Sequence, residues 1–320
     1  MNMRALVTGG AGFIGSHLID KLIVNGSHVT AYDNLSSGLR ENISHNFRNS
    51  RFRFIEADLL EVENVKKAVR GCDMVFHMAS NPDISKGMIQ TDLDLKQGVL
   101  TLYNVLESMR LAGVKKIFFP SGSGVYGDVG TTPTDECFGP LLPISLYGTS
   151  KLACEALINA FCHMFDMQAW IARLANIVGA RQTHGVVLDF IRKLRQNPDE
   201  LEVLGDGTQS KSYVHVSDCV EAIMFIIDHS ADRVNIFNVA SSDYVKVTSI
   251  ARIVVEEMGL GNVRFRYTGG SRGWKGDVPK VRMDVSKINA LGWKSSMTSE
   301  EAVRLAVNEL QGPNPLSSVR

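Results

Sequence analysis

The chain has no surplus of either charge, because its 34 lysine and arginine residues are balanced by 34 aspartate and glutamate residues. Attraction to nucleic acid or to an anionic membrane needs a basic surplus. We therefore predict neither a nucleic-acid partner nor a membrane partner. Any anion that the protein binds is expected to be held by local groups rather than by a general field.

Cysteine is scarce, and no two cysteines have CxxC spacing. An odd number of cysteines without that spacing argues against a disulfide framework and against a zinc site. We predict reduced, mostly buried thiols and no bound metal. The five residues are Cys72, Cys137, Cys154, Cys162 and Cys219.

Long apolar runs are missing as well. No stretch reaches the roughly 20 residues that span a bilayer, and the chain enters its first predicted strand by Met3, without room for a signal peptide. We therefore expect a cytoplasmic protein. Its 320 residues and 44% hydrophobic content suit one large domain or two lobes with a sizeable core.

A glycine-rich turn is present near the start, in RALVTGGAGFIGSHLIDKLIVNG at residues 4–26. The apolar run at 5–7 predicts a buried strand, and helical apolar spacing after the glycines predicts a helix that ends near Gly26. Such a turn brings backbone N–H groups and the positive end of a helix dipole to one point, where a pyrophosphate can be held. The glycines of the turn are Gly9, Gly10, Gly12 and Gly15.

Asp33 ends a second predicted strand, 28–33, and lies 18 residues beyond Gly15. A dinucleotide-binding fold places here the carboxylate that accepts both ribose hydroxyls. An ionised carboxylate repels a 2′-phosphate, so the position indicates NAD rather than NADP. The alternative, a purely structural turn with a solvated Asp33, is disfavoured by the order of strand, turn, helix, strand and acid.

Strands continue to alternate with helices through the first half of the chain. This alternation predicts an α/β fold with a parallel, doubly wound (Rossmann) sheet that binds ligand at the carboxyl ends of its strands. Asp58 follows the third strand, where it either contacts the adenine or caps the next helix. The predicted strands are 52–57, 74–79 and 116–120, and the predicted helices are 59–70 and 90–112.

Tyr147 and Lys151 begin a further predicted helix that runs to about residue 165. Their spacing of four puts phenol and ammonium on one face of the first turn, where the cation favours the phenolate. Lowering the pKa of a tyrosine from about 10 to about 7 takes roughly 4 kcal/mol, which Lys151 and a nicotinamide cation can supply together. Without a cofactor fold upstream, the pair would indicate only a helix start and a surface lysine.

The second half of the chain breaks the alternation. Residues 176–215 are rich in loops, and the last hundred residues mix short strands with amphipathic helices at 249–258 and 299–310. We predict a smaller mixed α/β lobe that closes over a second ligand beside the cofactor. The predicted division is an NAD-binding domain at 1–175 with segments at about 212–240 returning to it, a substrate lobe at 176–312, and a frayed tail at 313–320.

Seven motifs occur in order: TGGAGFIGSH, YDNLSSG, HMASNP, VYGD, YGTSK, ANIVGAR and GDGTQSKSYVHVSD. Together they resemble the extended short-chain dehydrogenase/reductase family over essentially the whole chain, with most similarity to UDP-glucose 4-epimerases of the short archaeal type. The resemblance implies tightly bound NAD, a UDP-sugar substrate, and a homodimer formed by the helices near 90–112 and 146–165.

The resemblance also implies roles for individual residues. Tyr147 is the base that takes the sugar 4-hydroxyl proton while hydride leaves C4 for the nicotinamide, and Lys151 lowers its pKa and holds the nicotinamide ribose. Ser121 and Ser123 are candidate hydroxyl groups beside it. The implied cofactor-binding residues are Gly9, Gly12, Phe13, Ile14, Gly15, Asp33, Asn34, Ser37, Gly38, Asp58, Leu59, Met78, Ala79, Tyr147 and Lys151.

In the substrate lobe, the resemblance assigns the diphosphate to Asn176, Lys211 and Arg272, and the uridine ribose to Asp277. Lys211 stands where an arginine is usual, which replaces a bidentate contact with a point charge. The alternative for Lys211 and Arg272 is that they are solvated surface cations. Val281 stands where relatives carry either a large aromatic, which limits the site to plain hexoses, or a small residue, which admits an N-acetyl group.

Two positions depart from the family pattern. A serine or threonine is usual four residues before the tyrosine of VYG, where this chain has Gly122, and an asparagine is usual where it has Gly98. Dehydratases and decarboxylases of nucleotide sugars carry an acid between that hydroxyl and the tyrosine, and here Ser123 and Gly124 carry none. The motifs therefore favour C4 epimerisation. A dehydratase, a reductase or a catalytically weak NAD- and UDP-sugar-binding protein are the alternatives.

Overall fold

The computed structural model describes residues 2–312, which divide into two compact units. Unit 1 contains the chain up to Val125, together with Ser145–Arg173 and Ile223–Phe237. Unit 2 contains Tyr126–Ile144, Leu174–Ala222 and the chain from Asn238 onwards. The predicted tail at 313–320 lies outside the described residues.

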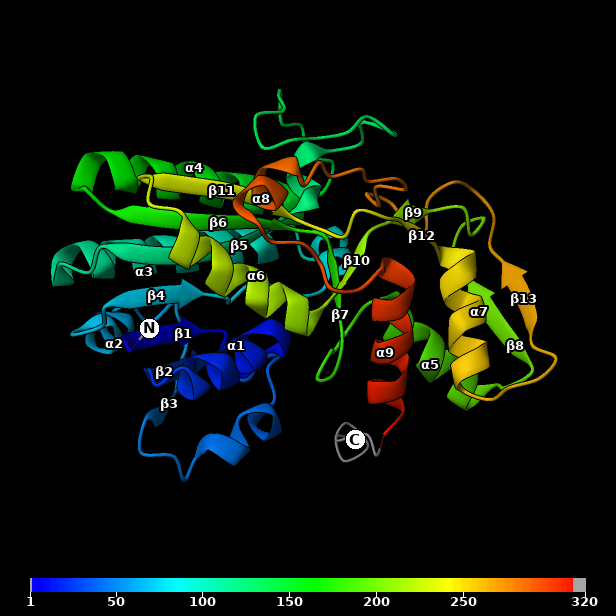
Figure 1. The fold of residues 1–320 in the computed structure, drawn as a ribbon, viewed down its shortest axis with the longest axis horizontal. Helices are drawn as coiled ribbons and strands as arrows, with labels where there is room; N and C mark the ends of the chain where they lie inside the picture. Colours follow the sequence, from blue (N-terminus) through cyan, green and yellow to red (C-terminus); the bar gives the residue numbers. More distant parts are fainter. Residues whose placement is uncertain (1, 313–320) are drawn as a thin grey trace. The chain divides into compact units, whose positions relative to one another are not determined.

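A seven-stranded parallel sheet organises unit 1, with the strand order β11-β6-β5-β4-β1-β2-β3 (Figure 1). Strand order reverses between β1 and β4, which creates the switch point at which doubly wound folds bind ligands. The predicted α/β Rossmann class is therefore confirmed. The strands are β1 (Arg4–Thr8), β2 (His28–Asp33), β3 (Phe52–Glu56), β4 (Met74–His77), β5 (Lys116–Gly122), β6 (Gln168–Leu174) and β11 (Val234–Val239).

The helices of this unit differ from the predictions mainly where the chain enters them. The continuous helix predicted at 90–112 opens instead with a π-helical segment, Leu95–Leu100, before α3. The predicted helix 59–70 is shorter, because Glu61 is the N-cap of α2. The helices are α1 (Phe13–Val24), α2 (Val62–Val69), α3 (Thr101–Ala112), α4 (Leu146–Phe165) and the part from Ile223 of α6 (Val216–His229), with 3₁₀ turns at Arg40–Asn42, Ser44–Asn46, Ile84–Met88 and Ser123–Tyr126.

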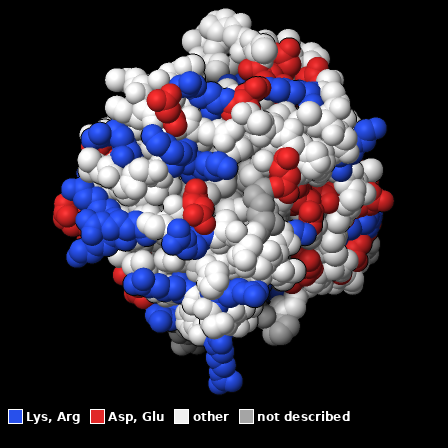
Figure 2. All heavy atoms as spheres, turned by 60° about the vertical axis from the view of Figure 1, so that its left-hand side comes forward, with Lys and Arg blue, Asp and Glu red and all other residues white. Residues whose placement is uncertain are grey.

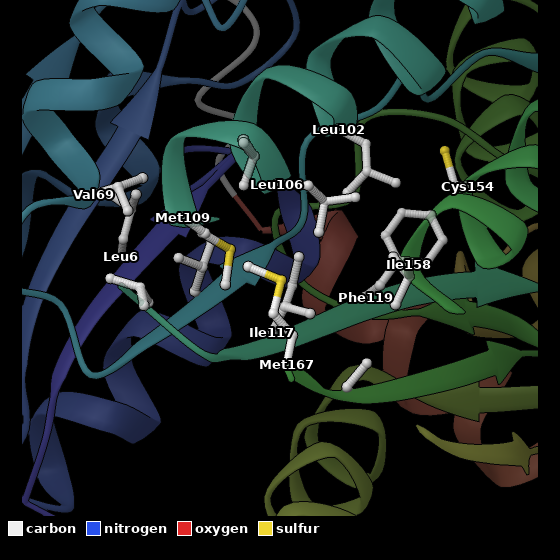
Figure 3. Close-up of a cluster of buried hydrophobic side chains, with 14 of the residues drawn as sticks. Leu6, Val69, Leu102, Leu106, Met109, Ile117, Phe119, Cys154, Ile158 and Met167 are labelled. Carbon is white, nitrogen blue, oxygen red and sulfur yellow. The ribbon is translucent and has the colours of Figure 1, made fainter. Parts of the chain in front are cut away.

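One hydrophobic core joins α2, α3 and α4 to one face of the sheet (Figure 3). Leu6 of β1, Val69 of α2 and Leu106 of α3 are fully buried in it. Alternation along the strands directs the neighbouring side chains to the other face, where Ala31 lies beside Ile19 of α1. Each fully buried large aliphatic side chain contributes about 1.5–3 kcal/mol to folding, so this core holds the ligand-binding edge of the sheet in place.

Unit 2 has short strand pairs and its own core. Strands β7 and β10 are parallel, β9 and β12 antiparallel, and β8 and β13 parallel. Helix α9 starts with a complete capping box, in which Thr298 and Glu301 satisfy each other's backbone N–H groups. The elements are β7 (Asn176–Val178), α5 (Val186–Gln196), β8 (Glu200–Val203), β9 (Ser210–Lys211), β10 (Tyr213–His215), β12 (Val245–Lys246), α7 (Val247–Glu257), β13 (Arg264–Tyr267), α8 (Ser286–Leu291) and α9 (Ser299–Gln311).

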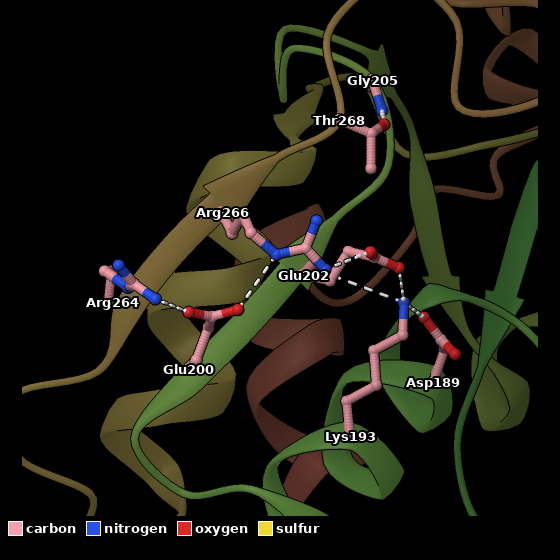
Figure 4. Close-up of polar contacts among 8 residues, drawn as sticks. All are labelled: Asp189, Lys193, Glu200, Glu202, Gly205, Arg264, Arg266 and Thr268. Carbon is pink, nitrogen blue, oxygen red and sulfur yellow. Dashed lines mark hydrogen bonds and ion pairs between the residues drawn. The ribbon is translucent and has the colours of Figure 1, made fainter.

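Charged side chains cross the β8–β13 pair on its exposed face (Figure 4). Glu200 of β8 pairs with Arg264 and Arg266 of β13, and Lys193 of α5 reaches Asp189 at 2.8 Å. The arginines are at least half exposed, so water and salt screen these pairs. They fix the register of this small sheet more than they stabilise it.

All five cysteines are free. Burial raises the pKa of Cys154 and Cys162 to about 11 and that of Cys219 to about 12, so these thiols are protonated at neutral pH. Cys72 is half-buried, and Cys137 departs from the prediction because it is exposed.

Within residues 2–312, no helix combines the length and the apolar character needed to cross a membrane.

Candidate active site

The glycine turn between β1 and α1 is closed by backbone hydrogen bonds. Gly9 has a φ of +65°, and a β-carbon added there would lie 2.6 Å from the backbone nitrogen of Ala79. A β-carbon on Gly15 would lie 2.3 Å from the carbonyl oxygen of Gly9. Both positions therefore require glycine, because strand β4 and helix α1 approach the turn too closely for a side chain.

The amino end of α1 can receive an anion. Its N-cap, Gly12, has no side chain to occupy the first N–H groups, and the first turn carries no acid. The N–H groups of Phe13, Ile14 and Gly15 precede the first intrahelical donor, Ser16, which bonds to Gly12. This open end with its positive dipole fits a pyrophosphate.

Asp33 lies at the end of β2 beside this turn and is 8% exposed. Its Oδ2 accepts from the Ala11 N–H at 2.9 Å and its Oδ1 from the Leu35 N–H at 2.8 Å. Burial raises the pKa of this carboxyl, while the two backbone hydrogen bonds oppose the rise. The carboxylate is thus fixed in position and keeps lone pairs for ribose hydroxyls.

The loops after β2 and β3 meet at Asp58. Asn34 donates to Asp58 Oδ2 at 2.9 Å, and Asp58 Oδ1 accepts from the Leu60 N–H at 2.8 Å. Since α2 begins at Val62 after Glu61, the alternative that Asp58 caps this helix is wrong. The adenine contact stays a prediction.

The other predicted cofactor residues near this edge differ in their exposure. Ser37 is exposed and Gly38 is buried against Asp33, where a β-carbon would lie 2.9 Å from Oδ2. Leu59 buries its side chain in the core, so only its backbone can face a ligand. Met78 and Ala79 follow β4 directly and are half-buried, with the Met78 N–H donating to the Thr8 carbonyl at 3.0 Å.

Tyr147 and Lys151 lie on one face at the start of α4, as predicted. Ser145 is the N-cap and accepts from the Gly148 N–H at 3.1 Å. The Lys151 ammonium is buried and donates to the Pro120 carbonyl at the end of β5 over 2.8 Å. Its nitrogen lies 5.4 Å from the centre of the Tyr147 ring. Strand β5 therefore anchors the cation beside the tyrosine ring.

The chain bends directly after Gly122. Strand β5 ends at this glycine, and Ser123 opens a 3₁₀ turn. Ser121 is 3% exposed, and its hydroxyl has no hydrogen-bond partner among the described residues. The two candidate serines therefore do not share one extended segment, because the bend separates them.

Gly98 lies in the π-helical segment against α4. A β-carbon there would meet Ser150 Oγ at 3.1 Å, and this hydroxyl donates to the Tyr147 carbonyl at 2.8 Å. An asparagine at position 98 would thus have to displace Ser150, one residue from Lys151. π-Helical segments are frequent at functional sites. The helical spacing of the sequence gave no sign of this one.

The structure adds two buried side chains that the sequence did not single out. Asp94 is 2% exposed, with Oδ1 bound by Asn81 at 3.0 Å and Oδ2 unpartnered among the described residues. Burial raises its pKa, and the Asn81 hydrogen bond and the charge of Lys151 oppose the rise. Burial and the charge of Lys151 lower the pKa of His77 to about 3, so its imidazole is neutral.

In unit 2, three of the four predicted substrate residues lie together. Lys211 Nζ lies 2.7 Å from Asp277 Oδ1, and Arg272 donates to the Asp277 carbonyl at 2.9 Å. Arg272 also pairs with Asp128 at 2.6 Å. Both cations are held in ion pairs, with the Arg272 side chain 42% exposed, and their binding of the diphosphate stays a prediction. Asn176, the fourth residue, is half-buried on β7, and its backbone pairs with Tyr213 of β10 rather than with this cluster.

Asp128 is the residue of this cluster that the sequence did not reveal. It belongs to the VYGD motif, but nothing in its spacing indicated that it would reach Arg272, 144 residues away.

Within residues 2–312, no group of three or more histidine, cysteine or acidic side chains could hold a metal ion.

These features define a doubly wound dinucleotide-binding fold with a tyrosine–lysine pair at the carboxyl edge of its sheet. The family model for the NAD dependent epimerase/dehydratase family matches residues 5–240. The chain belongs to this family.

Three similar proteins cover nearly the whole chain. A Methanocaldococcus jannaschii protein with the provisional name UDP-glucose 4-epimerase is 31% identical, over 97% of this chain and 99% of its own. A solved structure of a UDP-galactose 4-epimerase is 39% identical, covers 97% of this chain and 99% of its own, and has a TM-score of 0.85. The Thermus thermophilus UDP-glucose 4-epimerase in complex with NAD is 31% identical over 97% and 99%, with a TM-score of 0.87.

Proposed function

We propose that this protein is an NAD-dependent epimerase that inverts C4 of a UDP-hexose, interconverting UDP-glucose and UDP-galactose and also accepting their N-acetylamino forms. The observation that carries the proposal is the Tyr147–Lys151 pair, with its ammonium fixed on the Pro120 carbonyl. This pair shares unit 1 with the glycine turn and Asp33. The family and the similar 4-epimerases support the same reaction.

The cofactor would be held by the residues that fit it. The N–H groups at the start of α1 take the pyrophosphate, Asp33 takes the ribose hydroxyls, and Asp58 faces the adenine. Bound NAD supplies the acceptor for the C4 hydride and returns it. Lys151, buried and bound to Pro120, would hold the nicotinamide ribose.

Tyr147 carries the proton in this proposal. As phenolate, it takes the proton of the sugar 4-hydroxyl, and Lys151 stabilises the negative charge before the transfer. The product is a 4-keto sugar, which turns over within the site. Tyr147 would then return the proton to the oxygen at C4 and become the phenolate again. The configuration at C4 is inverted because the turned sugar would take the hydride back on its other face.

Unit 2 would bind the nucleotide part of the substrate. Arg272, Lys211 and Asn176 take the diphosphate, and Asp277 takes the uridine ribose. Asp277 Oδ1 already accepts from Lys211 and Oδ2 from the Gly273 N–H at 3.1 Å, which holds the carboxylate in place. Phosphate binding would have to compete for Lys211 with Asp277, and for Arg272 with Asp128.

A dehydratase is the nearest alternative, because the family includes that class. Elimination needs a further proton carrier, and Ser123 and Gly124 offer no carboxylate beside Tyr126. A catalytically weak NAD- and UDP-sugar-binding protein is the second candidate. Gly122 and the close contact of Gly98 with Ser150 favour it, since both replace polar residues that are usual near the reacting groups.

We further propose a cytoplasmic homodimer joined through α3 and α4. These helices expose Tyr103, Leu111 and Met164, which are 46%, 56% and 72% exposed. Apolar side chains on a helix pair are typical of a surface that a second copy covers. We propose the domain division predicted above as the functional one, with NAD on the first part and the UDP-sugar on the second, except that residues 126–144, which hold Asp128, go with the second part.

The test is direct. Purified protein is incubated separately with UDP-glucose, UDP-galactose and their N-acetylamino forms, and the sugars are followed by NMR. Interconversion of a C4 pair supports the proposal, whereas a 4-keto-6-deoxy product identifies a dehydratase and unchanged sugars an inert binder. Mass spectrometry of the denatured protein should find NAD(H), and finding NADP alone would contradict the role of Asp33.

A further inference from the structure

A groove runs from the amino-terminal ends of β1 and β2 along the whole of β3, beside helix α2. Its volume is about 530 Å³, within the ~300–1,000 Å³ that is typical of small-molecule sites. The starts of β1 and β2 and the length of β3 form one side of the groove, and the helix from Asn64 to its end forms the other. All of its residues belong to unit 1.

The groove and the glycine turn lie at opposite ends of β1 and β2, whereas along β3 the groove extends to Ala57, next to Asp58. Strands β1 and β2 are parallel and pair from Arg4 with His28 to Thr8 with Tyr32, directly before the glycine turn. The groove lies at the first end of these strands and the turn at the other. At ~3.3 Å per residue, a five-residue strand separates the two ends by about 15 Å, so a ligand at the start of β1 and β2 does not reach the glycine turn.

The groove concentrates positive charge in a chain with no net charge. Its single carboxylate is Glu56, which is paired with Arg40 at 3.0 Å. Arg4 is paired with Asp73. The other four basic side chains make no hydrogen bond or ion pair with any of the described residues, and they are Arg51, Arg53, Lys67 and Arg70.

Helix electrostatics explains only part of this arrangement. Lys67 and Arg70 lie near the carboxyl end of α2, where cations offset the helix dipole. Arg51 and Arg53 come from the strand side and line the same groove, which the dipole does not account for. Figure 2 brings the α2 side of Figure 1 forward and shows lysine and arginine side chains gathered on this face.

The floor between the cations is apolar and half-buried. Ile55, Ala57, Ala68 and Cys72 form it. Such a floor suits a planar ring, while the charged rim suits phosphate oxygens, which guanidinium groups bind in pairs. We propose that the groove is a second nucleotide site, which binds a nucleoside di- or triphosphate through its phosphates and its base.

The test has to exclude binding of the probe at the NAD site and at the UDP-sugar site. The probe is ADP, added to NAD-loaded protein in the presence of saturating UDP, and binding is measured by titration calorimetry at two salt concentrations. We expect ADP to bind and to bind more weakly at high salt, because the contacts are with phosphate. The double variant Arg53→Ala, Lys67→Ala should lower ADP affinity at least about tenfold, with two charge-assisted contacts removed.

A matched control removes the same charge from the neighbouring position. Lys66→Ala lies outside the groove, and Lys66 is paired with Glu63 at 2.7 Å, so ADP affinity should stay within about twofold. Arg70→Ala, which is exposed, gives a second variant if the double one fails to fold. No ADP binding by the unaltered protein, or equal binding by the groove variants, would overturn the proposal. Displacement of ADP by a single-stranded oligonucleotide of higher affinity would overturn the assignment to a free nucleotide. None of these results depends on turnover.

Discussion

Arg272 and Asp128 form an ion pair of 2.6 Å in unit 2. The guanidinium also donates to the Asp277 carbonyl, so NH1 and NH2 each make a hydrogen bond before any substrate arrives. Because Arg272 is a proposed ligand of the UDP diphosphate, Asp128 competes with the substrate for the same group. The pair is 42% and 28% exposed, which keeps its strength modest.

Asp128→Asn should therefore strengthen UDP binding. An exposed ion pair is worth about 0.2–1 kcal/mol, which corresponds to an affinity gain of about 1.5- to 5-fold. Titration calorimetry with UDP measures it, and Asp128→Glu, which keeps the charge, is the control. Weaker binding by Asp128→Asn would mean that Asp128 positions Arg272 instead of competing for it.

Tyr147→Phe should abolish interconversion while leaving UDP binding nearly intact, since it removes the proton carrier and no substrate anchor. The readouts are turnover by NMR and UDP affinity by calorimetry. Tyr267→Phe, which removes a hydroxyl from an exposed tyrosine of unit 2, serves as the control and should leave turnover unchanged. Parallel loss of UDP binding in Tyr147→Phe would show that its role is misassigned.

Gly122→Ser should raise kcat. Gly122 is not among the residues with positive φ, so a serine can adopt its backbone conformation at the end of β5. A positioned hydroxyl at a reacting oxygen is worth about 2–4 kcal/mol in an optimised site, and we expect at least a threefold gain, roughly 0.7 kcal/mol. A fall in kcat with NAD still bound would mean that the glycine makes room for another group.

The neighbouring serines show what fills the place of the missing hydroxyl. If the bend brings the Ser123 hydroxyl into the place of the missing one, Ser123→Ala should lower kcat strongly. If the buried, unpartnered hydroxyl of Ser121 fills that place, Ser121→Ala should be the costly change. If a water does so, both should be mild. Steady-state kinetics of the two variants distinguishes these outcomes.

Val281→Tyr should shift the substrate preference towards plain hexoses. Val281 is small and half-buried beside Ser210, so it leaves room for an N-acetyl group, and the unaltered protein should accept UDP-GlcNAc as well as UDP-glucose. A tyrosine would occupy that room. The measurement is the ratio of kcat/KM for the two sugars, and an unchanged ratio would refute the assignment of Val281.

NAD affinity should fall on acidification at a pH above the usual range of an aspartate. Burial raises the pKa of Asp33, so this carboxylate, the proposed acceptor of the ribose hydroxyls, protonates at a higher pH than a solvated one. The affinity for NAD therefore has its full value above the raised pKa and falls as the pH drops through it. Fluorescence titration between about pH 7 and pH 4.5 tests this, and Asp33→Asn should bind weakly with no such pH dependence.

The order of elements in unit 1 could be read from local pattern. Strand β2 was predicted at its observed bounds, and Tyr147 and Lys151 were placed on one helical face because their spacing of four matches the helical repeat. Glycines and Asp33 mark the turn since backbone sterics and a fixed motif length dictate both. These features are set by residues that lie close together in the sequence, so the sequence alone is enough to predict them.

The contacts between distant segments followed from packing alone. The Pro120 carbonyl that holds Lys151, the π-helical segment around Gly98, and the buried Asp94 depend on how α4 and the segment before α3 pack on the sheet. The pairing of Arg272 with Asp128 joins residues 144 positions apart. The cationic groove likewise combines strand starts with the end of α2. Periodicity along the chain records which face a residue occupies, but the partner opposite that face is set only when the elements pack together in three dimensions.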